Sequence, residues 1–278
     1  MQPLLPFKKQ TVRVFSLISI NSVLLYLLAY ISLFLVTRLT TAVVASTFNI
    51  STVIYYYDID FLIKSKDWSS DAVSAVFSAP PLIVLILSLI LFVIYREIVS
   101  FSGISGIFIA WLFIHCLGYL AGEIIMGSIL NRGFGYVLMY GFIMDTGKLA
   151  LTMISGLIIL LIGRAISRLM LLSANVYLND LKGKVILKFT ISQFILPFII
   201  STVILQICEL PNFSLYLFTS RCILLLLLLP LVSRSLTIND LYFDEEPRLP
   251  VFSASLAFIT VLVLVAYRIV FGIGLRII

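Results

Sequence analysis

Long apolar stretches alternate with short polar segments along this chain, and seven of the stretches are long enough, or nearly so, to cross a bilayer. The hydrocarbon core of a bilayer is about 30 Å thick and takes roughly 20 helical residues to cross. The predicted spans are approximately Phe15–Val36, Pro81–Tyr95, Gly103–Gly122, Leu149–Gly163, Val185–Ile207, Leu215–Val232 and Val251–Phe271. The pattern therefore predicts an all-α transmembrane fold, a polytopic bundle of about seven helices that forms a single domain over residues 1–278.

The composition supports this interpretation. Of 278 residues, 62% are apolar and 12% charged, whereas globular domains average about 45–50% apolar and about 25% charged residues. The net charge of +6 could indicate nucleic-acid binding, but the basic residues flank apolar spans, where orientation and anionic headgroups explain them. The first apolar run exceeds the roughly 7–15 residues of a signal-peptide core, which favours a retained helix. We expect the lipid bilayer as a partner and no nucleic acid.

Basic residues predict the orientation, because loops rich in lysine and arginine stay in the cytoplasm. With the N-terminus inside, eleven basic residues fall on the cytoplasmic side: Lys8, Lys9, Arg13, Arg96, Arg164, Arg168, Lys182, Lys184, Lys188, Arg234 and Arg248. Six fall outside: Arg38, Lys64, Lys66, Arg132, Lys148 and Arg276. We therefore predict a cytoplasmic N-terminus and a C-terminus outside, in a membrane that the compact loops suggest is a bacterial inner membrane.

Two connections differ from plain loops. Residues 37–79 include a run rich in β-branched and aromatic residues, which indicates a small extracytoplasmic cap with strand character, or else an interfacial segment. Residues 164–177 carry basic residues on an apolar background, which predicts a helix lying along the cytoplasmic membrane surface. The last cytoplasmic loop, residues 233–250, carries several acidic residues and is expected to be solvated.

The segment 131–148 allows two interpretations. Its apolar part, Gly133–Met144, is too short to cross the membrane, and the span that follows it, between Lys148 and Arg164, is short as well. A re-entrant or broken helix would explain both facts, with Asp145 capping the second half. The alternative is an interfacial loop in which the Lys148 side chain snorkels to the surface.

The third span holds the only histidine of the chain, His115. Trp111, His115, Gly118 and Gly122 recur at helical spacing, so they share one helix face. An overlapping stripe of small residues, typical of close helix packing, consists of Gly106, Ala110, Gly118 and Gly122. We expect His115 to point into the bundle, either as a neutral hydrogen-bonded side chain or in a proton-carrying or metal-binding role. No metal site and no cofactor are expected, because the cysteines and the histidine match no zinc spacing.

The remaining intramembrane charges gather in the outer half, and each needs a reason because a buried charge in a membrane is costly. They are Glu123, Asp145, Lys148, Glu209, Arg221 and Arg268. One interpretation is structural ion pairing, with Glu209 and Arg221 as the best pair because only a short loop separates their helices. The other is a polar vestibule, open to the outside, that forms a substrate or ion site.

The motif His115-Cys-Leu-Gly-Tyr119 at the end of an apolar helix resembles the His-Glu-x-Gly-His helix of the M50, site-2-protease-like membrane metallopeptidases. Asp145-Thr-Gly147 is similar to that family's Asp-Gly segment, which supplies a third zinc ligand. Cys116 stands where the general-base glutamate belongs and Tyr119 where the second histidine belongs. The resemblance covers four residues and implies a degenerate relative without the intact catalytic motif.

Three functions follow from these observations. The first is a non-catalytic membrane subunit or scaffold that packs through its glycine stripe against other membrane subunits or a second copy of itself. The second is a small transporter or permease with a polar site in the outer half. The third is a membrane-embedded hydrolase that uses His115 with Glu123 or Asp145.

Overall fold

The computed structural model describes residues 7–98, 103–243 and 251–278. Within these ranges, seven helical segments are long and apolar enough to cross a membrane: Arg13–Thr47, Ser70–Ile98, Ile104–Leu130, Asp145–Val176, Lys184–Cys208, Leu215–Ser235 and Ala254–Ile273. Each overlaps one predicted span, so the expectation of a seven-helix, multi-pass membrane protein is confirmed. Most of the acidic loop residues, together with Arg248, lie outside the described residues.

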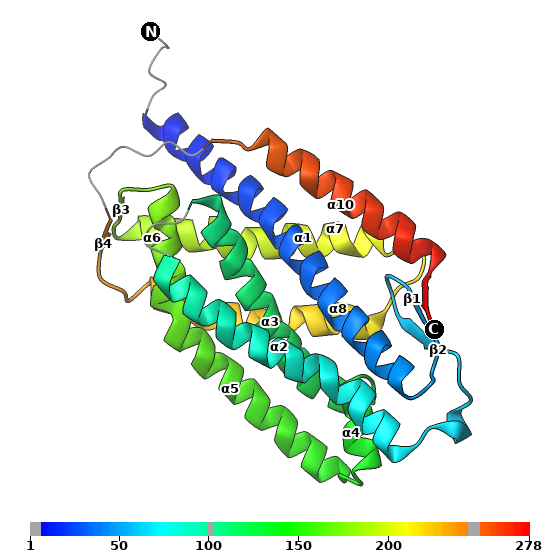
Figure 1. Cartoon of the computed structure of the whole chain (residues 1–278). Coiled ribbons are helices and arrows are strands. Elements are labelled where there is room, and N and C mark those ends of the chain that lie inside the picture. The colour runs from blue at the N-terminus through cyan, green and yellow to red at the C-terminus, as the bar shows by residue number, and fades with distance from the viewer. Residues whose placement is uncertain (1–6, 99–102, 244–250) are drawn as a thin grey trace.

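The elements follow one another as a simple succession of helices with short strands at the turns (Figure 1). The helices are α1 (Phe7–Thr47), α2 (Ser70–Ile98), α3 (Ile104–Leu130), α4 (Phe134–Tyr140), α5 (Asp145–Leu171), α6 (Lys184–Thr190), α7 (Leu196–Cys208), α8 (Leu215–Cys222), α9 (Leu224–Ser235) and α10 (Ala254–Ile273). The strands are β1 (Thr52–Ile54), β2 (Ile59–Phe61), β3 (Asp180–Leu181), β4 (Leu241–Tyr242) and β5 (Leu275–Ile277). Short 3₁₀ turns cover Ser65–Asp67 and Leu172–Val176, and a π-helical turn covers Ile191–Ile195.

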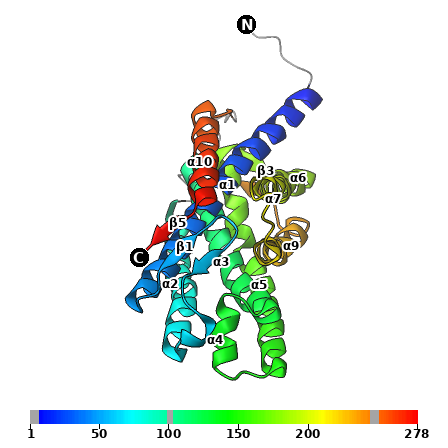
Figure 2. The same ribbon diagram turned by 90° about the vertical axis from the view of Figure 1, so that its right-hand side faces the viewer.

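Helix α3 forms the centre of the bundle and packs against α1, α2, α5 and α8. In its most apolar stretch 61% of the residues are buried inside the protein, against 17% in α10. Helix α10 packs on α1 at the margin of the bundle (Figures 1 and 2). The exposed apolar faces of α2, α5 and α10 are the surfaces that lipid would cover.

The two ends of the bundle carry different small sheets. At the end where the C-terminus lies, β1 pairs with β2 on one side and with β5 on the other, all antiparallel, and we call this the sheet end (Figure 1). At the opposite end, β3 pairs with β4. The described ends of the chain therefore lie at opposite ends of the bundle.

Several helices are longer than the sequence predicts. Helix α1 continues to Thr47, and the hydroxyls of Thr37 and Thr41 donate to carbonyls one turn earlier, so these polar groups are satisfied within the helix. Helix α2 begins at Ser70, where the Ser69 hydroxyl accepts a bond from the Ala72 amide, so Pro80 and Pro81 lie inside it. Only residues 48–69 remain between the two helices, rather than 37–79. The β-branched run forms β1 and β2 within them.

The fourth span is also longer than expected, and this removes one premise of the broken-helix interpretation. Helix α5 runs from Asp145 to Leu171, so Arg164 and Arg168 belong to the spanning helix and not to a separate surface helix. Met144, with no side-chain bond, occupies the N-cap position that was predicted for Asp145. The preceding segment holds the seven-residue α4 and a turn.

Two spans are continuous helices with a local distortion. The π-helical turn at Ile191–Ile195 separates α6 from α7, and residue Ile223 separates α8 from α9. π-helical turns inside α-helices frequently mark functional sites. The distortion at Ile223 lies beside an internal cavity near the sheet end, and the π-helical turn contacts the packed region beneath that cavity.

Candidate functional site

A cavity of about 500 Å³ lies inside the bundle near the sheet end. Helices α1, α2 and α3 and the α8–α9 pair form its walls, and residues 58–68 and 132–140 contribute at the rim. His115, Gly118 and Leu224 lie deepest. Along α3 the lining rises from His115 to Glu123, about 12 Å at 1.5 Å per residue. The volume falls within the range of roughly 300–1,000 Å³ typical of small-molecule sites.

A salt bridge spans the rim of the cavity. Arg132, from the α3–α4 turn, donates to Asp58, from the β1–β2 turn, at 3.0 Å, and both side chains are about half exposed. The bridge joins two loops that are far apart in the sequence. The exposed residues at this rim, together with Ser65, place the mouth of the cavity at the sheet end.

Arg38 lies on the cavity wall, on helix α1. The sequence assigns it to an outer loop, and the longer α1 moves it into the span. Tyr30, Phe34, Thr37 and Arg38 share a helix face, and the guanidinium carbon of Arg38 lies 5.5 Å from the Phe34 ring centroid. In the described part of the chain, no carboxylate lies within 4.0 Å of the Arg38 side-chain nitrogens. Its charge is therefore unpaired.

Glu123 fastens α4 to the bundle. The sequence places Glu123 at the end of the third span, but α3 continues past it to Leu130, so it faces the cavity from within the helix. Its carboxylate accepts a hydrogen bond from the backbone amide of Phe134 at 2.8 Å. Gly133 makes this approach possible: its φ of +54° favours glycine, and a Cβ there would collide with the carboxylate.

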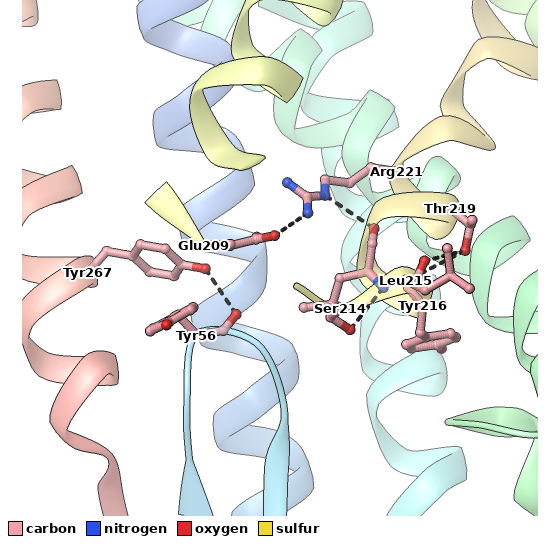
Figure 3. Close-up of polar contacts among 9 residues, drawn as sticks. Tyr56, Glu209, Ser214, Leu215, Tyr216, Thr219, Arg221 and Tyr267 are labelled. Atoms are coloured by element: carbon pink, nitrogen blue, oxygen red, sulfur yellow. Dashed lines mark hydrogen bonds and ion pairs between the residues drawn. The ribbon is translucent and has the colours of Figure 1, made fainter. Parts of the chain in front are cut away.

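Glu209 and Arg221 form the ion pair that the sequence predicts (Figure 3). The Nη2 of Arg221 donates to Glu209 at 2.5 Å, and its Nε donates to the carbonyl of Leu217 at 3.1 Å. Glu209 is fully buried and Arg221 is 7% exposed. Arg221 also lines the cavity, so the two interpretations of the outer charges meet at this residue.

His115 lines the floor of the cavity and points into the bundle, as predicted. Its Nε2 lies 3.3 Å from the carbonyl oxygen of Tyr26, and since a carbonyl only accepts, this nitrogen carries the proton. The ring lies edge-on to Tyr26, at 4.3 Å between centroids. No carboxylate in the described ranges lies within ion-pairing distance of the imidazole.

Three of the predicted site residues lie away from the cavity. The Asp145 side chain is fully exposed, and the Lys148 ammonium lies 3.7 Å from it and donates to Asn131 at 2.8 Å. Arg268, on α10, donates to the Leu210 carbonyl at 2.7 Å and stacks over the Tyr56 ring at 4.2 Å. These residues therefore form local contacts and do not join the cluster around Glu123.

The small-residue stripe of α3 packs against other helices of the same chain. A Cβ at Gly118 would lie 3.0 Å from Leu224 Cδ1, and a Cβ at Gly122 would lie 3.2 Å from Ser220 Cβ. Gly106 and Ala110 are buried as well. The stripe therefore brings α8 and α9 close to α3, and it places Arg221 opposite His115 and Glu123 across the cavity.

The sequence interpretation missed much of the lining. It overlooked the wall residues Arg38, Tyr30, Tyr119 and Tyr216 and the rim pair of Asp58 and Arg132. One signal was available: Tyr30, Phe34, Thr37, Arg38 and Thr41 follow helical spacing, which would have extended the first helix and shown a polar face. The rim pair had no such signal, because its members are 74 residues apart.

No group of three or more histidine, cysteine, aspartate or glutamate residues in the described ranges is arranged to hold a metal ion. Known proteins give no further guidance to the site, since no protein-family model, no curated protein and no solved structure matches this chain.

Proposed function

We propose that this multi-pass membrane protein is a small transporter or permease that takes up its solute in the cavity at the sheet end. The observation that carries the proposal is the cavity itself, which combines a ligand-sized volume with charged side chains held inside the membrane region. Ionisable groups within spans are costly and mark substrate or ion pathways more often than they serve packing.

Local distortions in two spanning helices support the transport proposal. Transporters commonly build their binding sites from discontinuous helices near the middle of the membrane. Here the spanning helix is only locally distorted at Ile223, which keeps helical dihedral angles (φ −58°, ψ −27°) and lies beside two lining residues, Arg221 and Leu224. The π-helical turn at Ile191–Ile195 lies beyond the cavity floor, where a path to the other side would have to open.

We propose that the sheet end faces the outside, following the distribution of basic residues. Lys182 and Lys184 lie at the opposite end, beside the β3–β4 pair, together with Arg164 and Arg168. The positive-inside rule puts that end in the cytoplasm. The cavity would then be open to the outside and closed towards the cytoplasm.

The two other functions have less support. Within the glycine stripe that motivated a scaffold, Gly118 and Gly122 pack against α9 and α8 of this chain, and Gly106 and Ala110 are buried, so the stripe is not exposed to a partner. A hydrolase needs a general acid or base in hydrogen-bond reach of its partner, while His115 donates to a backbone carbonyl and pairs with no carboxylate among the described residues.

Alternating access can be tested without knowing the solute. The native cysteines Cys116, Cys208 and Cys222 are replaced by alanine, and Ser220 in the cavity wall is replaced by cysteine. We expect a membrane-impermeant thiol reagent to label Ser220→Cys from the outside in intact cells. Because a transporter also opens to the cytoplasm, inside-out vesicles should be labelled as well, at a slower rate.

Ser22→Cys is the matched control, because Ser22 is fully buried beneath the cavity floor. It should resist labelling from the outside. Labelling of Ser220→Cys in intact cells but not in inside-out vesicles would contradict transport. Labelling only in inside-out vesicles would contradict the proposed orientation.

A further inference from the structure

Both carboxylates that line the cavity accept hydrogen bonds from described residues, whereas two of its arginines, Arg38 and Arg221, keep unused donors. Glu123 accepts from the Phe134 amide, and Asp58 accepts from Arg132. Arg38 has neither an ion pair nor a hydrogen bond with any described residue, and its guanidinium carbon lies 5.5 Å from the centroid of the Phe34 ring. Glu123 attracts Arg38 across the cavity, but from beyond ion-pairing distance.

Arg221, which is buried, also has a donor that no described residue uses. Two of its nitrogens are bonded, Nη2 to Glu209 and Nε to Leu217, while the buried Nη1 has no hydrogen-bond partner. The Oε1 of Glu209 also lacks a partner, but Glu209 does not line the cavity. Besides the neutral hydroxyls of Tyr216 and Ser220, the unused hydrogen-bonding groups inside the cavity therefore include positively charged donors, those of Arg38 and the Nη1 of Arg221.

The rest of the wall is largely aromatic. Phe77 lies between Trp68 and Tyr136, with ring centroids 5.8 and 4.9 Å away, and Tyr30 and Phe34 face them from α1. Such rings offer apolar and stacking surface to a ligand body. A buried donor without an acceptor is unfavourable, so a ligand that accepts from the Nη1 of Arg221 would remove that cost, and Arg38 would add its charge.

We infer that the cavity binds an organic anion, a carboxylate or phosphate head carried on an apolar or aromatic body. The anionic head is held by Arg38 and by the free Nη1 of Arg221, and the body lies among the rings of Trp68, Phe77 and Tyr136. This inference deepens the proposed function, because it takes the cavity to be the solute site. Two sources share this chemistry, a soluble organic acid and the headgroup of an anionic lipid.

A charged and a neutral probe of the same shape test the inference. The purified protein, in nanodiscs of phosphatidylcholine, is titrated with naphthalene-2-carboxylate and with naphthalene-2-carboxamide by calorimetry at pH 7. We expect the carboxylate to bind about tenfold more tightly than the amide, which corresponds to about 1.4 kcal/mol. Equal affinities, or no binding of the carboxylate, would overturn the inference.

Arg38→Gln should remove the preference for the carboxylate and leave the amide affinity unchanged, while Arg38→Lys should retain part of it. Arg276→Gln is the matched control, since Arg276 is exposed at the same end and does not line the cavity. A carboxylate preference that survives Arg38→Gln would also overturn the inference. If Arg38→Gln fails to fold, the ratio of carboxylate affinity to amide affinity, measured for the wild-type protein and for Arg38→Lys, decides.

Phosphatidylglycerol added to the nanodiscs separates the two sources. If it displaces the carboxylate probe from wild-type protein, a lipid headgroup can occupy the site. If it does not, the ligand is a soluble acid, and either result supports an anion site.

Uptake into proteoliposomes separates this inference from the proposed function. Carboxylate binding without uptake would contradict only the proposal of transport. Uptake of the amide in preference to the carboxylate would contradict only the proposal of an anionic ligand.

Discussion

The sheet-end half and the opposite half of the bundle use the same two helices in different ways. Towards the sheet end, α1 and α3 are separated by the cavity and present Arg38 and Glu123 to it. Towards the opposite end, the Trp111 indole on α3 donates to Ser22 on α1 at 2.7 Å, and Ser22 donates to the Gln193 carbonyl at 2.6 Å. The interior of one half is hollow and carries charged side chains, and the interior of the other is filled with uncharged ones.

Aromatic packing closes the filled half. Trp111 is fully buried and lies 4.9 Å from Tyr26 and 5.6 Å from Phe194, measured between ring centroids. The difference shows that the hollow does not result from loose packing of the whole bundle, because side chains one or two turns away on α1 and α3 fill their space. Some polar groups of the filled half lack a hydrogen-bond partner among the described residues, and one of them is the whole side-chain amide of Gln193, on the π-helical turn.

The largest effect should come from Glu209→Leu, beside the cavity. It leaves the Arg221 charge buried without its partner, and breaking such pairs costs about 3–5 kcal/mol. The variant should show a strongly reduced melting temperature in detergent. The double variant Glu209→Leu/Arg221→Met, which removes both charges, should recover most of the loss. A small effect of the single variant would mean that the hollow half tolerates unpaired charge in general.

Gln193→Leu should have the second largest effect, and in the opposite direction. Replacing a buried, unpartnered amide by an apolar side chain of similar size should stabilise the filled half by about 1–3 kcal/mol. The melting temperature should rise, and cytoplasmic labelling of Ser220→Cys should slow if this turn opens during transport. Gln206, which also has a buried amide without a described partner, provides the matched substitution elsewhere on the same span. Destabilisation by Gln193→Leu would contradict the comparison.

A smaller effect is expected from Arg38→Met on the ligand-free protein. Since no ion pair is lost, the free energy of unfolding should stay within about 1 kcal/mol of the wild-type value, or rise slightly. Urea unfolding in detergent measures it. A loss comparable to that of Glu209→Leu would show that Arg38 has a structural partner and would weaken the case for an anion site.

The smallest effect should come from Arg132→Gln at the rim. Exposed ion pairs contribute about 0.2–1 kcal/mol, so the melting temperature should hardly change. Because the bridge to Asp58 spans the mouth, outside labelling of Ser220→Cys should become faster. Asp58→Asn should reproduce the change, whereas Asp145→Asn, a fully exposed carboxylate at the same end, should not.

The sequence by itself determined the solvent and the class of the fold. Within the hydrocarbon core, a continuous apolar run of bilayer length can satisfy all of its backbone hydrogen bonds by forming a membrane-spanning helix. All seven spans follow from this requirement. The pair of Glu209 and Arg221 could also be predicted, because a short loop joins their helices and each charge needs a partner.

Tertiary structure alone decided the site. Arg38 became a cavity residue because α1 extends beyond its most apolar part, and Asp145 stayed outside although its local motif suggested a role. The cavity exists because residues from five parts of the chain meet around α3, and the β1–β5 pairing joins segments more than 200 residues apart. Such contacts depend on how the helices pack, and the pattern along one helix does not contain that information.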